Sequence, residues 1–249
     1  MNVKETEFAE KFKIYRYDGD CFGGVKPGAM LRYAQQIAGE HAAALGLTDE
    51  VYTRTHTAHV LAKLALHFDR CPHVDEELTL ITKPERLKRA VNKRVTDFFD
   101  VTGTQVAQVD SRWVVIDTDK RMILRTHPAE YATANWAAEV PEELPMRMQK
   151  RPLEETTVLG ERTADYSLCD MNGHLNNTRY ADILCNALPW TVWENNTLQD
   201  LLLFYHKEVP HGESFTLHAA RLSENQWYFA GVREGKACFE ANMTFRPRG

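Results

Sequence analysis

The feature of this chain that most constrains its fold is an internal repeat, because its two halves place the same kinds of segment in the same order. Each half has a short extended segment, a helical stretch and then about four segments in which apolar and polar residues alternate. Such alternation is typical of half-buried β-strands. We expect strands near residues 57–70, 75–86, 90–102 and 105–117, and again near 198–208, 213–222, 225–233 and 236–245. A long helix followed by an antiparallel meander predicts an α+β layer, with a strongly curved sheet over the helix.

Short sequence matches support the repeat and suggest its register. Arg32-Tyr33-Ala34 and Arg179-Tyr180-Ala181 lie in corresponding helical stretches. This alignment pairs Asp18 with Asp165, Gly23 with Asp170, Val25 with Asn172 and Pro27 with His174, and farther along it pairs Leu78-Thr79-Leu80 with Phe215-Thr216-Leu217. Two such units in tandem predict a pseudo-symmetric dimer within one chain. We expect a first domain at residues 1–137, a linker rich in Pro and Glu at 138–155, and a second domain at 156–249.

The second half carries a compact polar motif directly before its helix. Asp170, Asn172 and His174 place a carboxylate, an amide and an imidazole at alternate positions, and Asn176 and Asn177 follow as possible helix caps. A helix N-terminus offers unpaired N–H groups and partial positive charge, which suit an oxygen that gains negative charge. An ordinary polar turn is the alternative, because Asn, Asp and Gly are common turn residues. The residues paired with the triple in the first half cannot perform acid–base chemistry, so we expect a chemical site in the second half alone.

Composition narrows the function classes. The chain has 249 residues, 43% of them hydrophobic, which is enough for a sizeable core. No apolar run approaches the ~20 residues of a membrane span, and residues 1–13 do not resemble a signal peptide. Five cysteines without Cys-x-x-Cys spacing argue against a disulfide framework or a zinc site and favour the cytoplasm. A net charge of −5 gives no reason to expect nucleic-acid binding, and no motif calls for a cofactor.

Basic residues are concentrated in one predicted hairpin. They are Lys83, Arg86, Lys88, Arg89, Lys93 and Arg94. One interpretation is a solvated turn, and the other is a docking patch for an acidic partner on an otherwise acidic protein.

Four stretches of the sequence resemble those of a known family, the acyl-acyl carrier protein thioesterases of bacteria and plants, which consist of two fused hotdog domains. They are residues 14–18 with the following 32–36 helix, residues 111–114 through Arg121, the Asp170-x-Asn172-x-His174-x-Asn176-Asn177-x-x-Tyr180 motif, and residues 203–208. The resemblance runs nearly from end to end. It departs at Val209, where several plant members have a cysteine, so a thiol nucleophile is not expected at that position. The plant transit peptide is also missing, so plastid targeting is not implied.

The resemblance implies a thioester hydrolase that releases fatty acids from acyl carrier protein. Glu208 is then the candidate base that takes a proton from water, with Asn172 and His174 orienting the water or the carbonyl and Asp170 holding one of them. Whether Asp170 or Glu208 is the primary base stays open. Backbone N–H groups from His174 to Asn177 are candidate oxyanion donors. The candidate substrate-binding residues are Asn176, Asn177 and Tyr180, and Lys83, Arg86, Lys88 and Arg89 are the candidate carrier-protein docking residues.

Other functions remain open at this stage. The same fold could act on acyl-CoA, could bind acyl thioesters without turnover, or could be a dehydratase; a homodimer is also possible. His56, His59 and His67 are expected to be core or surface histidines and not metal ligands. We expect Cys169, beside Asp170, to be a bystander, because it lacks a histidine base at the spacing of a nucleophile.

Overall fold

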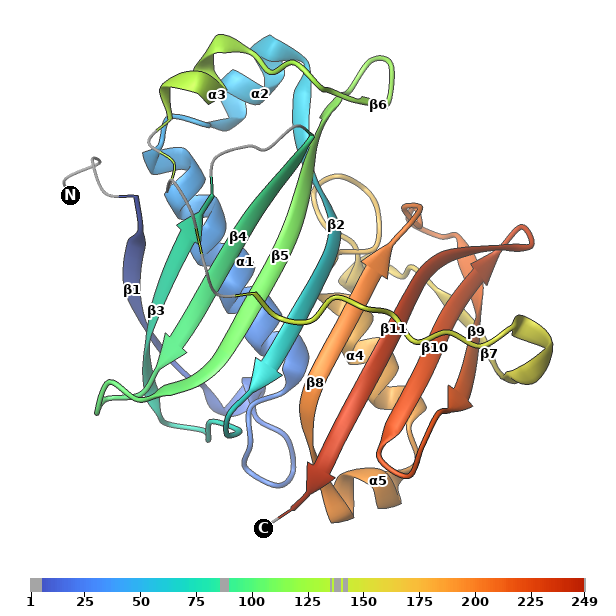
Figure 1. Ribbon diagram of the computed structural model, residues 1–249. Helices are drawn as coiled ribbons and strands as arrows, with labels where there is room; N and C mark the ends of the chain where they lie inside the picture. The colour runs from blue at the N-terminus through green and yellow to red at the C-terminus, as the bar shows by residue number, and fades with distance from the viewer. Residues whose placement is uncertain (1–5, 86–89, 135, 137–139, 141–142, 249) are drawn as a thin grey trace.

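The computed structural model describes residues 6–85, 90–134, 136, 140 and 143–248 (Figure 1). Its described strands form one antiparallel sheet in the order β1-β3-β4-β5-β2-β8-β11-β10-β9-β7, with β6 paired to β5. The first-half strands are β1 (Phe8–Lys13), β2 (Thr57–Phe68), β3 (Glu77–Pro84), β4 (Val91–Phe99), β5 (Gln105–Asp117) and β6 (Met122–Ile123). The second-half strands are β7 (Thr157–Thr163), β8 (Asn196–Tyr205), β9 (Ser214–Arg221), β10 (Gln226–Arg233) and β11 (Lys236–Pro247). Each half therefore has the four predicted strands, but the predicted meander is wrong for the first of them. Strand β2 pairs with β5, and β8 pairs with β11, so only the last three strands of each half follow one another in chain order.

The two halves join where β2 pairs with β8. Leu64 lies opposite Leu203 and Leu66 opposite Leu201, and all four side chains are buried. At the end of this pairing the His67 Nδ1 atom lies 2.7 Å from Asp200 Oδ1. Because the central pairing is apolar and continuous, the sheet runs through both halves without a break (Figure 1).

Each half of the sheet curves round a helix. The first contains α1 (Pro27–Ala44) and the second contains the shorter α4 (Arg179–Ala187), as Figure 1 shows. The smaller helices are α2 (Asp49–Thr55), α3 (Ala129–Thr133), α5 (Trp190–Asn195) and the 3₁₀ turns η1 (Arg16–Asp18), η2 (Leu153–Glu155) and η3 (Tyr166–Leu168). Pro27 opens α1, where its missing N–H costs nothing. The buried face of α1 includes Met30, Ala34, Ile37 and His41, at the spacing of one helical stripe.

Helices α1 and α4 meet between the halves at a close contact. The Arg32 Nη1 atom of α1 donates to Asp182 Oδ2 of α4 over 3.0 Å. Beside them, a Cβ at Gly28 would lie 2.1 Å from Asp182 Oδ1, so any larger residue there would displace the Asp182 carboxylate.

Residues 143–152, which lie between the halves, cross the outer face of the sheet toward η2 (Figure 1). The Leu144 amide donates to Asp110 Oδ2 of β5 over 3.2 Å, and Gln149 exchanges two hydrogen bonds with the Asn242 side chain of β11. Lys93 of β4 donates to the Val140 carbonyl. The linker is thus fastened to both halves, while the predicted domain boundaries stay a prediction.

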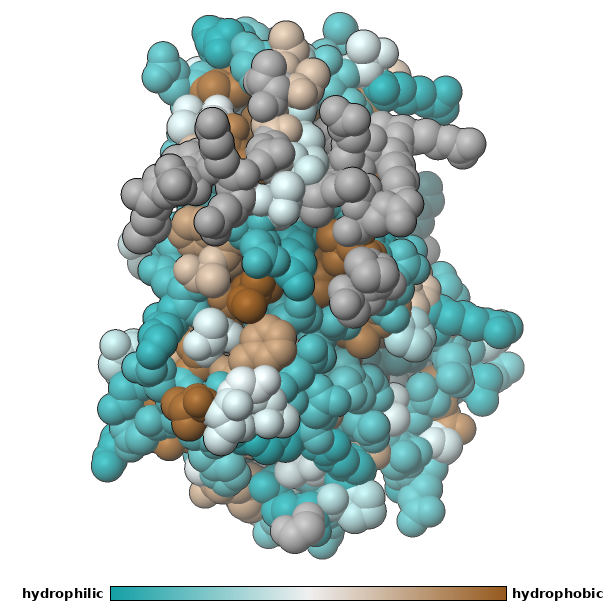
Figure 2. All heavy atoms as spheres, turned by 60° about the vertical axis from the view of Figure 1, so that its left-hand side comes forward, coloured by the Kyte–Doolittle hydropathy of each residue, from teal (hydrophilic) through white to brown (hydrophobic). Residues whose placement is uncertain are grey.

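The free edge of the first half is polar. Strand β1 exposes Glu10, Lys11 and Lys13. The face that brings this edge forward is mainly hydrophilic, with apolar side chains in small separate groups (Figure 2). Charged edge strands of this kind discourage pairing with another chain.

Candidate active site

The turn before the main helix has the same hydrogen bonds in both halves, and these bonds fix the register of the repeat. The Asp170 amide donates to the His174 carbonyl over 3.1 Å, and the Asp20 amide donates to Gly24 over 2.7 Å. Gly173 and Gly23 hold the same place in the turn with φ of 75° and 83°, a region that favours glycine.

The predicted pairing of Gly23, Val25 and Pro27 with the polar triple is therefore wrong by three residues. The counterparts of Asp170, Asn172 and His174 are Asp20, Phe22 and Gly24. The error arose because Arg32-Tyr33-Ala34 begins nine residues after the turn glycine Gly23, whereas Arg179-Tyr180-Ala181 begins six residues after Gly173. The predicted match of Leu78 with Phe215 holds. The residues just before them make equivalent strand pairs, since Glu77 pairs with Lys13 and Ser214 pairs with Thr163.

Within the second-half turn, His174 lies between two carboxylates. Its Nδ1 atom is 3.8 Å from Asp170 Oδ1, and its Nε2 atom is 3.9 Å from Glu208 Oε2. The sequence-predicted members Asp170, His174 and Glu208 are therefore brought together. Asn172 lies exposed in the same turn, and its backbone amide donates to Asp170 Oδ1 over 2.9 Å. The site can thus hold a water or carbonyl oxygen near an imidazole flanked by two acids.

Glu208 lies in the loop after β8 and not on the strand that we expected to reach residue 208. The strand ends at Tyr205 because the amides of His206 and Lys207 both donate to the Cys238 carbonyl. The Glu208 carboxylate is paired with Arg121, whose Nη2 atom lies 2.9 Å from Oε1. Arg121 comes from the turn after β5 in the first half, so both halves contribute to the site, a role that the sequence did not reveal.

The residues that follow His174 form the turn that leads into α4. Asn176 Oδ1 accepts hydrogen bonds from the Thr178 amide (3.0 Å) and hydroxyl (2.7 Å) within this turn. The N-cap position of α4 is Thr178, whose side chain makes no capping bond, so the expected side-chain cap is not formed. The Asn176 Nδ2 group donates to Asp170 Oδ2 over 3.1 Å. Tyr180 is buried against Tyr205, with ring centroids 5.2 Å apart. These contacts of Tyr180 are those of a packing residue, so its predicted role in substrate binding stays a prediction.

Two of the four expected oxyanion donors are already occupied. The Leu175 amide donates to the Val209 carbonyl (2.8 Å) and the Asn176 amide to the Leu168 carbonyl (3.0 Å). The amides of His174 and Asn177 have no protein acceptor within the described part of the chain. These two N–H groups are therefore the available donors for a substrate oxygen.

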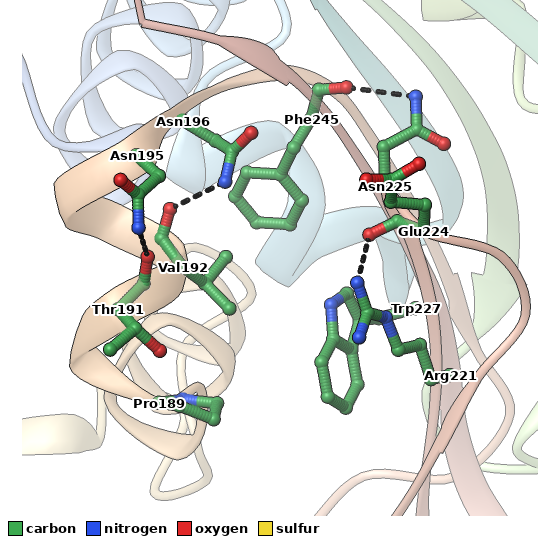
Figure 3. Close-up of a pocket in the computed structure, with 10 residues that line it drawn as sticks. All are labelled: Pro189, Thr191, Val192, Asn195, Asn196, Arg221, Glu224, Asn225, Trp227 and Phe245. Carbon is green, nitrogen blue, oxygen red and sulfur yellow. Dashed lines mark hydrogen bonds between the residues drawn. The ribbon is translucent and has the colours of Figure 1, made fainter.

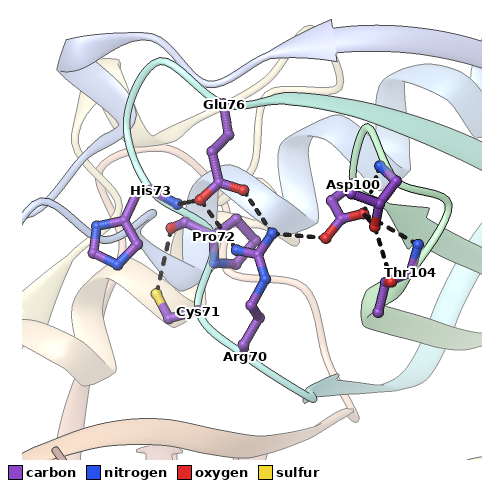
Figure 4. Close-up of polar contacts among 8 residues, drawn as sticks. Arg70, Cys71, Pro72, His73, Glu76, Asp100 and Thr104 are labelled. Carbon is purple, nitrogen blue, oxygen red and sulfur yellow. Dashed lines mark hydrogen bonds and ion pairs between the residues drawn. The ribbon is translucent and has the colours of Figure 1, made fainter. Parts of the chain in front are cut away.

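The corresponding place in the first half is closed. Cys71 stands where Glu208 stands, since Gly24 pairs with His73 as His174 pairs with Pro210. A Cβ at Gly24 would lie 2.8 Å from Cys71 Sγ, which leaves no room for an imidazole. The Cys71 loop is fixed by Glu76, which accepts from the His73 amide and pairs with Arg70 (Figure 4). Only the second copy therefore keeps the polar triple.

Two hollows with shared lining residues adjoin the site. A cleft of about 370 Å³ is lined by Asp170, Asn176 and Thr178 together with Gln35 of α1. Behind it, a narrow cavity of about 30 Å³ lies between α1 and the first-half sheet and shares Gln35 and Thr178 with the cleft. His174 and Glu208 line neither hollow, whereas Asn177 lines the narrow cavity.

A third hollow, of about 310 Å³, lies beside α5 in the second half (Figure 3). Its polar groups are used within the protein: the Asn195 and Asn196 amides donate to the Thr191 and Val192 carbonyls, at 2.8 and 3.0 Å. Its titratable lining residues are Arg221 and Glu224, and Arg221 donates to the Glu224 carbonyl.

The other candidate residues have structural contacts. Cys169 donates to the Ala164 carbonyl, and burial together with Asp170 raises the pKa of its thiol, which disfavours a thiolate nucleophile. His56 pairs with Asp119 and His67 with Asp200. Burial, Arg94 and His127 lower the pKa of His59 to about 4. Among the described residues no group of three His, Cys, Asp or Glu side chains could hold a metal ion.

Two residues of the predicted basic patch are not on the surface. Lys93 and Arg94 of β4 are buried, 5% and 6% exposed, because one faces the linker and the other faces the narrow cavity. Lys83 is paired with Asp97 at 3.6 Å and Glu7 at 3.9 Å. Arg86, Lys88 and Arg89 lie outside the described residues.

Comparison with known proteins now decides the family. Residues 5–133 match the acyl-ACP thioesterase N-terminal domain, and residues 154–246 match the acyl-ACP thioesterase C-terminal domain, where ACP is acyl carrier protein. The chain belongs to the acyl-ACP thioesterase family. It is 22% identical over 227 residues to the chloroplastic oleoyl-acyl carrier protein thioesterase of Coriandrum sativum, covering 83% of this chain and 60% of the relative. It is also 22% identical over 220 residues to the chloroplastic oleoyl-acyl carrier protein thioesterase 1 of Arabidopsis thaliana, an alignment that covers 81% of this chain and 60% of the relative. The chain thus spans about 60% of the length of these curated relatives.

Solved structures confirm the tandem hotdog fold of the acyl-ACP thioesterase family. An acyl-ACP thioesterase from Bacteroides thetaiotaomicron superimposes with a TM-score of 0.87 at 21% identity, covering 99% of this chain and 100% of that one. The 12:0-ACP thioesterase from Umbellularia californica gives 0.86 at 17% identity, with 98% of each chain covered. Within the described residues, no helix of this family member is long and apolar enough to cross a membrane.

Proposed function

We propose that this protein hydrolyses acyl-ACP thioesters and releases a free fatty acid. The observation that carries the proposal is the position of His174 between Asp170 and Glu208, three residues before Asn177, which lines a cavity under α1. The relatives named above as oleoyl- and 12:0-acyl carrier protein thioesterases support the choice of substrate class. In the reaction a water oxygen adds to the thioester carbonyl carbon, the C–S bond breaks, and the thiol leaves with a proton.

Glu208 is the proposed base, and Asp170 a positioning residue. In the closed first-half turn, Asp20 Oδ1 accepts from the Phe22 and Gly24 amides, each at 2.9 Å. Asp170 makes the corresponding bond to the Asn172 amide. An aspartate is therefore present in the first-half turn even though no imidazole fits there. The role that Asp20 and Asp170 share is to hold the turn in its conformation. The first half has Cys71, which is not an acid, at the position that corresponds to Glu208. An acid present only in the half with the polar site is expected to serve the chemistry and not the fold.

The steps then follow from the available groups. Glu208 takes a proton from a water molecule that His174 and Asn172 orient. General-base catalysis of this kind raises the rate by about 10²- to 10⁴-fold. The free amides of His174 and Asn177 stabilise the oxyanion, and one such donor contributes about 3–4 kcal/mol. The acyl chain enters the cavity between α1 and the first-half sheet. Since that cavity is only about 30 Å³, α1 must move outward to admit the chain.

Acyl-CoA is the alternative carrier, and binding without turnover is the alternative function. Hydrolysis of one acyl group on ACP and on CoA, by wild type and by Glu208→Gln, separates them. A higher kcat/KM on ACP supports the proposal, a higher value on CoA changes the carrier, and binding without hydrolysis by wild type contradicts an enzymatic role. A docking patch that includes Lys83, Arg86, Lys88 and Arg89, a homodimer and a cytoplasmic location stay predictions.

A further inference from the structure

The side of the narrow cavity that β4 and β5 form under α1 includes polar and positively charged residues. Arg94 and Thr96 reach it from β4, and Ser111 reaches it from β5. All three residues are buried, with Arg94 only 6% exposed. The cavity thus contains a guanidinium group that is removed from water.

The Arg94 guanidinium has no acidic partner among the described residues. Its Nη1 atom donates to Thr82 Oγ1 over 3.1 Å and lies 3.3 Å from His41 Nδ1. Burial lowers the pKa of Arg94 to about 10, so it stays protonated at neutral pH. The neighbouring basic residues differ, because Lys93 pairs with Glu143 and Arg112 with Asp110.

The other titratable groups around Arg94 do not balance its charge. His59 of β2 has a pKa of about 4 and is neutral, and burial raises the pKa of Tyr52 of α2 well above the neutral range. A buried cation without a counter-ion is costly unless a ligand supplies one.

The walls that lead to Arg94 are apolar. They are formed by Leu31, Ala34 and Ala38 of α1, by Leu61 and Leu64 of β2 and by Val109 of β5. From Leu31 to Ala38 the helix rises roughly 10 Å, about the length of a medium acyl chain. Apolar walls with a cationic end would suit an alkyl chain that carries an anionic group at its far end. An ordinary alkyl end would instead leave the guanidinium desolvated and unpaired.

We propose, on the basis of the proposed thioesterase function, that the preferred substrates are acyl thioesters whose acyl group ends in a carboxylate, and that this carboxylate pairs with Arg94. Arg94 is then a specificity-determining residue at the end of the cavity opposite the thioester. A bidentate pair between guanidinium and carboxylate would supply both charge and direction.

The test compares two series of acyl-ACP substrates, alkanoyl and ω-carboxyalkanoyl, with four to about twelve carbons. We expect wild type to show at least about tenfold higher kcat/KM for the ω-carboxyl member at one chain length. Arg94→Met should abolish this preference and favour alkanoyl chains, while Arg94→Lys should keep part of it. Arg54→Met, which removes an exposed arginine that pairs with Glu130 outside the cavity, should leave the ratio unchanged.

The outcomes separate this inference from the proposed function. Equal or higher kcat/KM for alkanoyl substrates at every length would overturn the role of Arg94 and leave the thioesterase intact. Hydrolysis of neither series would overturn the proposed function itself. If Arg94→Met fails to fold, the wild-type ratio still decides, together with product inhibition: the dicarboxylate must inhibit more strongly than the monocarboxylate of equal length.

Discussion

Arg121 donates a hydrogen bond to Glu208 across the two halves of the molecule, over 2.9 Å from Nη2 to Oε1. Arg121 stands in the turn after β5 with a positive φ of 52°, and Glu208 stands in the loop after β8. The pair places the candidate base beside His174, so a side chain of the first half orients a group of the second. The polar site therefore depends on how the two halves are joined.

Replacing the candidate base is the most direct test of the mechanism. Glu208→Gln keeps the size of the side chain but cannot accept a proton from water, so kcat should fall by about 10² to 10⁴. The measurement is steady-state hydrolysis of an acyl-ACP, with the far-UV spectrum confirming the fold. Glu234→Gln, an exposed neighbour that pairs with Lys207, is the control and should keep wild-type kcat. Full activity of Glu208→Gln would assign the base elsewhere.

The cross-domain pair predicts a smaller effect from its partner. Arg121→Ala should lower kcat by less than Glu208→Gln does, because it frees the carboxylate without removing it. Both side chains are largely in solvent, so the free energy of unfolding should change by less than about 1 kcal/mol. Lys120→Ala, whose lysine pairs with Asp117 in the same turn, is the matched control. A loss as large as that of Glu208→Gln would mean that Arg121 itself takes part in the chemistry.

The thiol next to the motif should be dispensable. Cys169 has a raised thiol pKa and donates to the Ala164 carbonyl. Cys169→Ser preserves that donor, and kcat should stay within about twofold of wild type, because water and not this thiol attacks the thioester. Mass spectrometry after rapid quenching should show no acyl group on any cysteine. An acylated cysteine would replace water attack with covalent catalysis.

Alternation of apolar and polar residues predicted the strands well, because one face of the sheet is buried over its whole length. The same alternation could have corrected the basic patch. Lys93 and Arg94 are neighbours in β4, so at least one of them had to face inward. The prediction of a basic patch rested on the number of charges in the hairpin and not on the face of the strand that each side chain occupies. It therefore placed Arg94, which faces the cavity, on the surface.

The errors at the site have a common cause, which is that loops and turns carry little periodic signal. The register of the repeat depended on the left-handed Gly23 and Gly173, and the helical Arg-Tyr-Ala matches could not reveal it. Likewise, Glu208 lies beyond the end of β8 because two amides share the Cys238 carbonyl. The pairing of Arg121 with Glu208 joins positions 87 residues apart, which no local pattern predicts.

Two glycines of α1 make a matched test of the contact between the helices. In Gly28→Ala the new Cβ would lie 2.1 Å from Asp182 Oδ1, so Asp182 must move and its bond to Arg32 is lost. We expect a loss of about 1–3 kcal/mol in the free energy of unfolding. Gly39→Ala has no heavy atom within 4 Å and should stabilise the helix by roughly 0.5–1 kcal/mol. Urea denaturation of both variants measures this, and equal effects would contradict the close approach of α1 and α4.

A carboxyl pair between β1 and α1 predicts how stability depends on pH. A hydrogen bond with Glu40, followed by partial burial and the charge of Glu40, raises the pKa of Glu10 from 4.5 to about 7. Because the folded protein binds this proton more tightly than the unfolded chain does, the stabilisation is complete below pH 4.5 and is lost as pH rises through 7. Glu10→Gln carries a permanent donor and no charge. Its melting temperature should therefore match wild type near pH 4.5 and exceed it increasingly toward pH 8. Glu77→Gln, which removes the exposed partner of Lys11 on the neighbouring strand, should show no such gain. A difference between Glu10→Gln and wild type that stays constant from pH 4.5 to 8 would show that Glu10 and Glu40 do not share a proton.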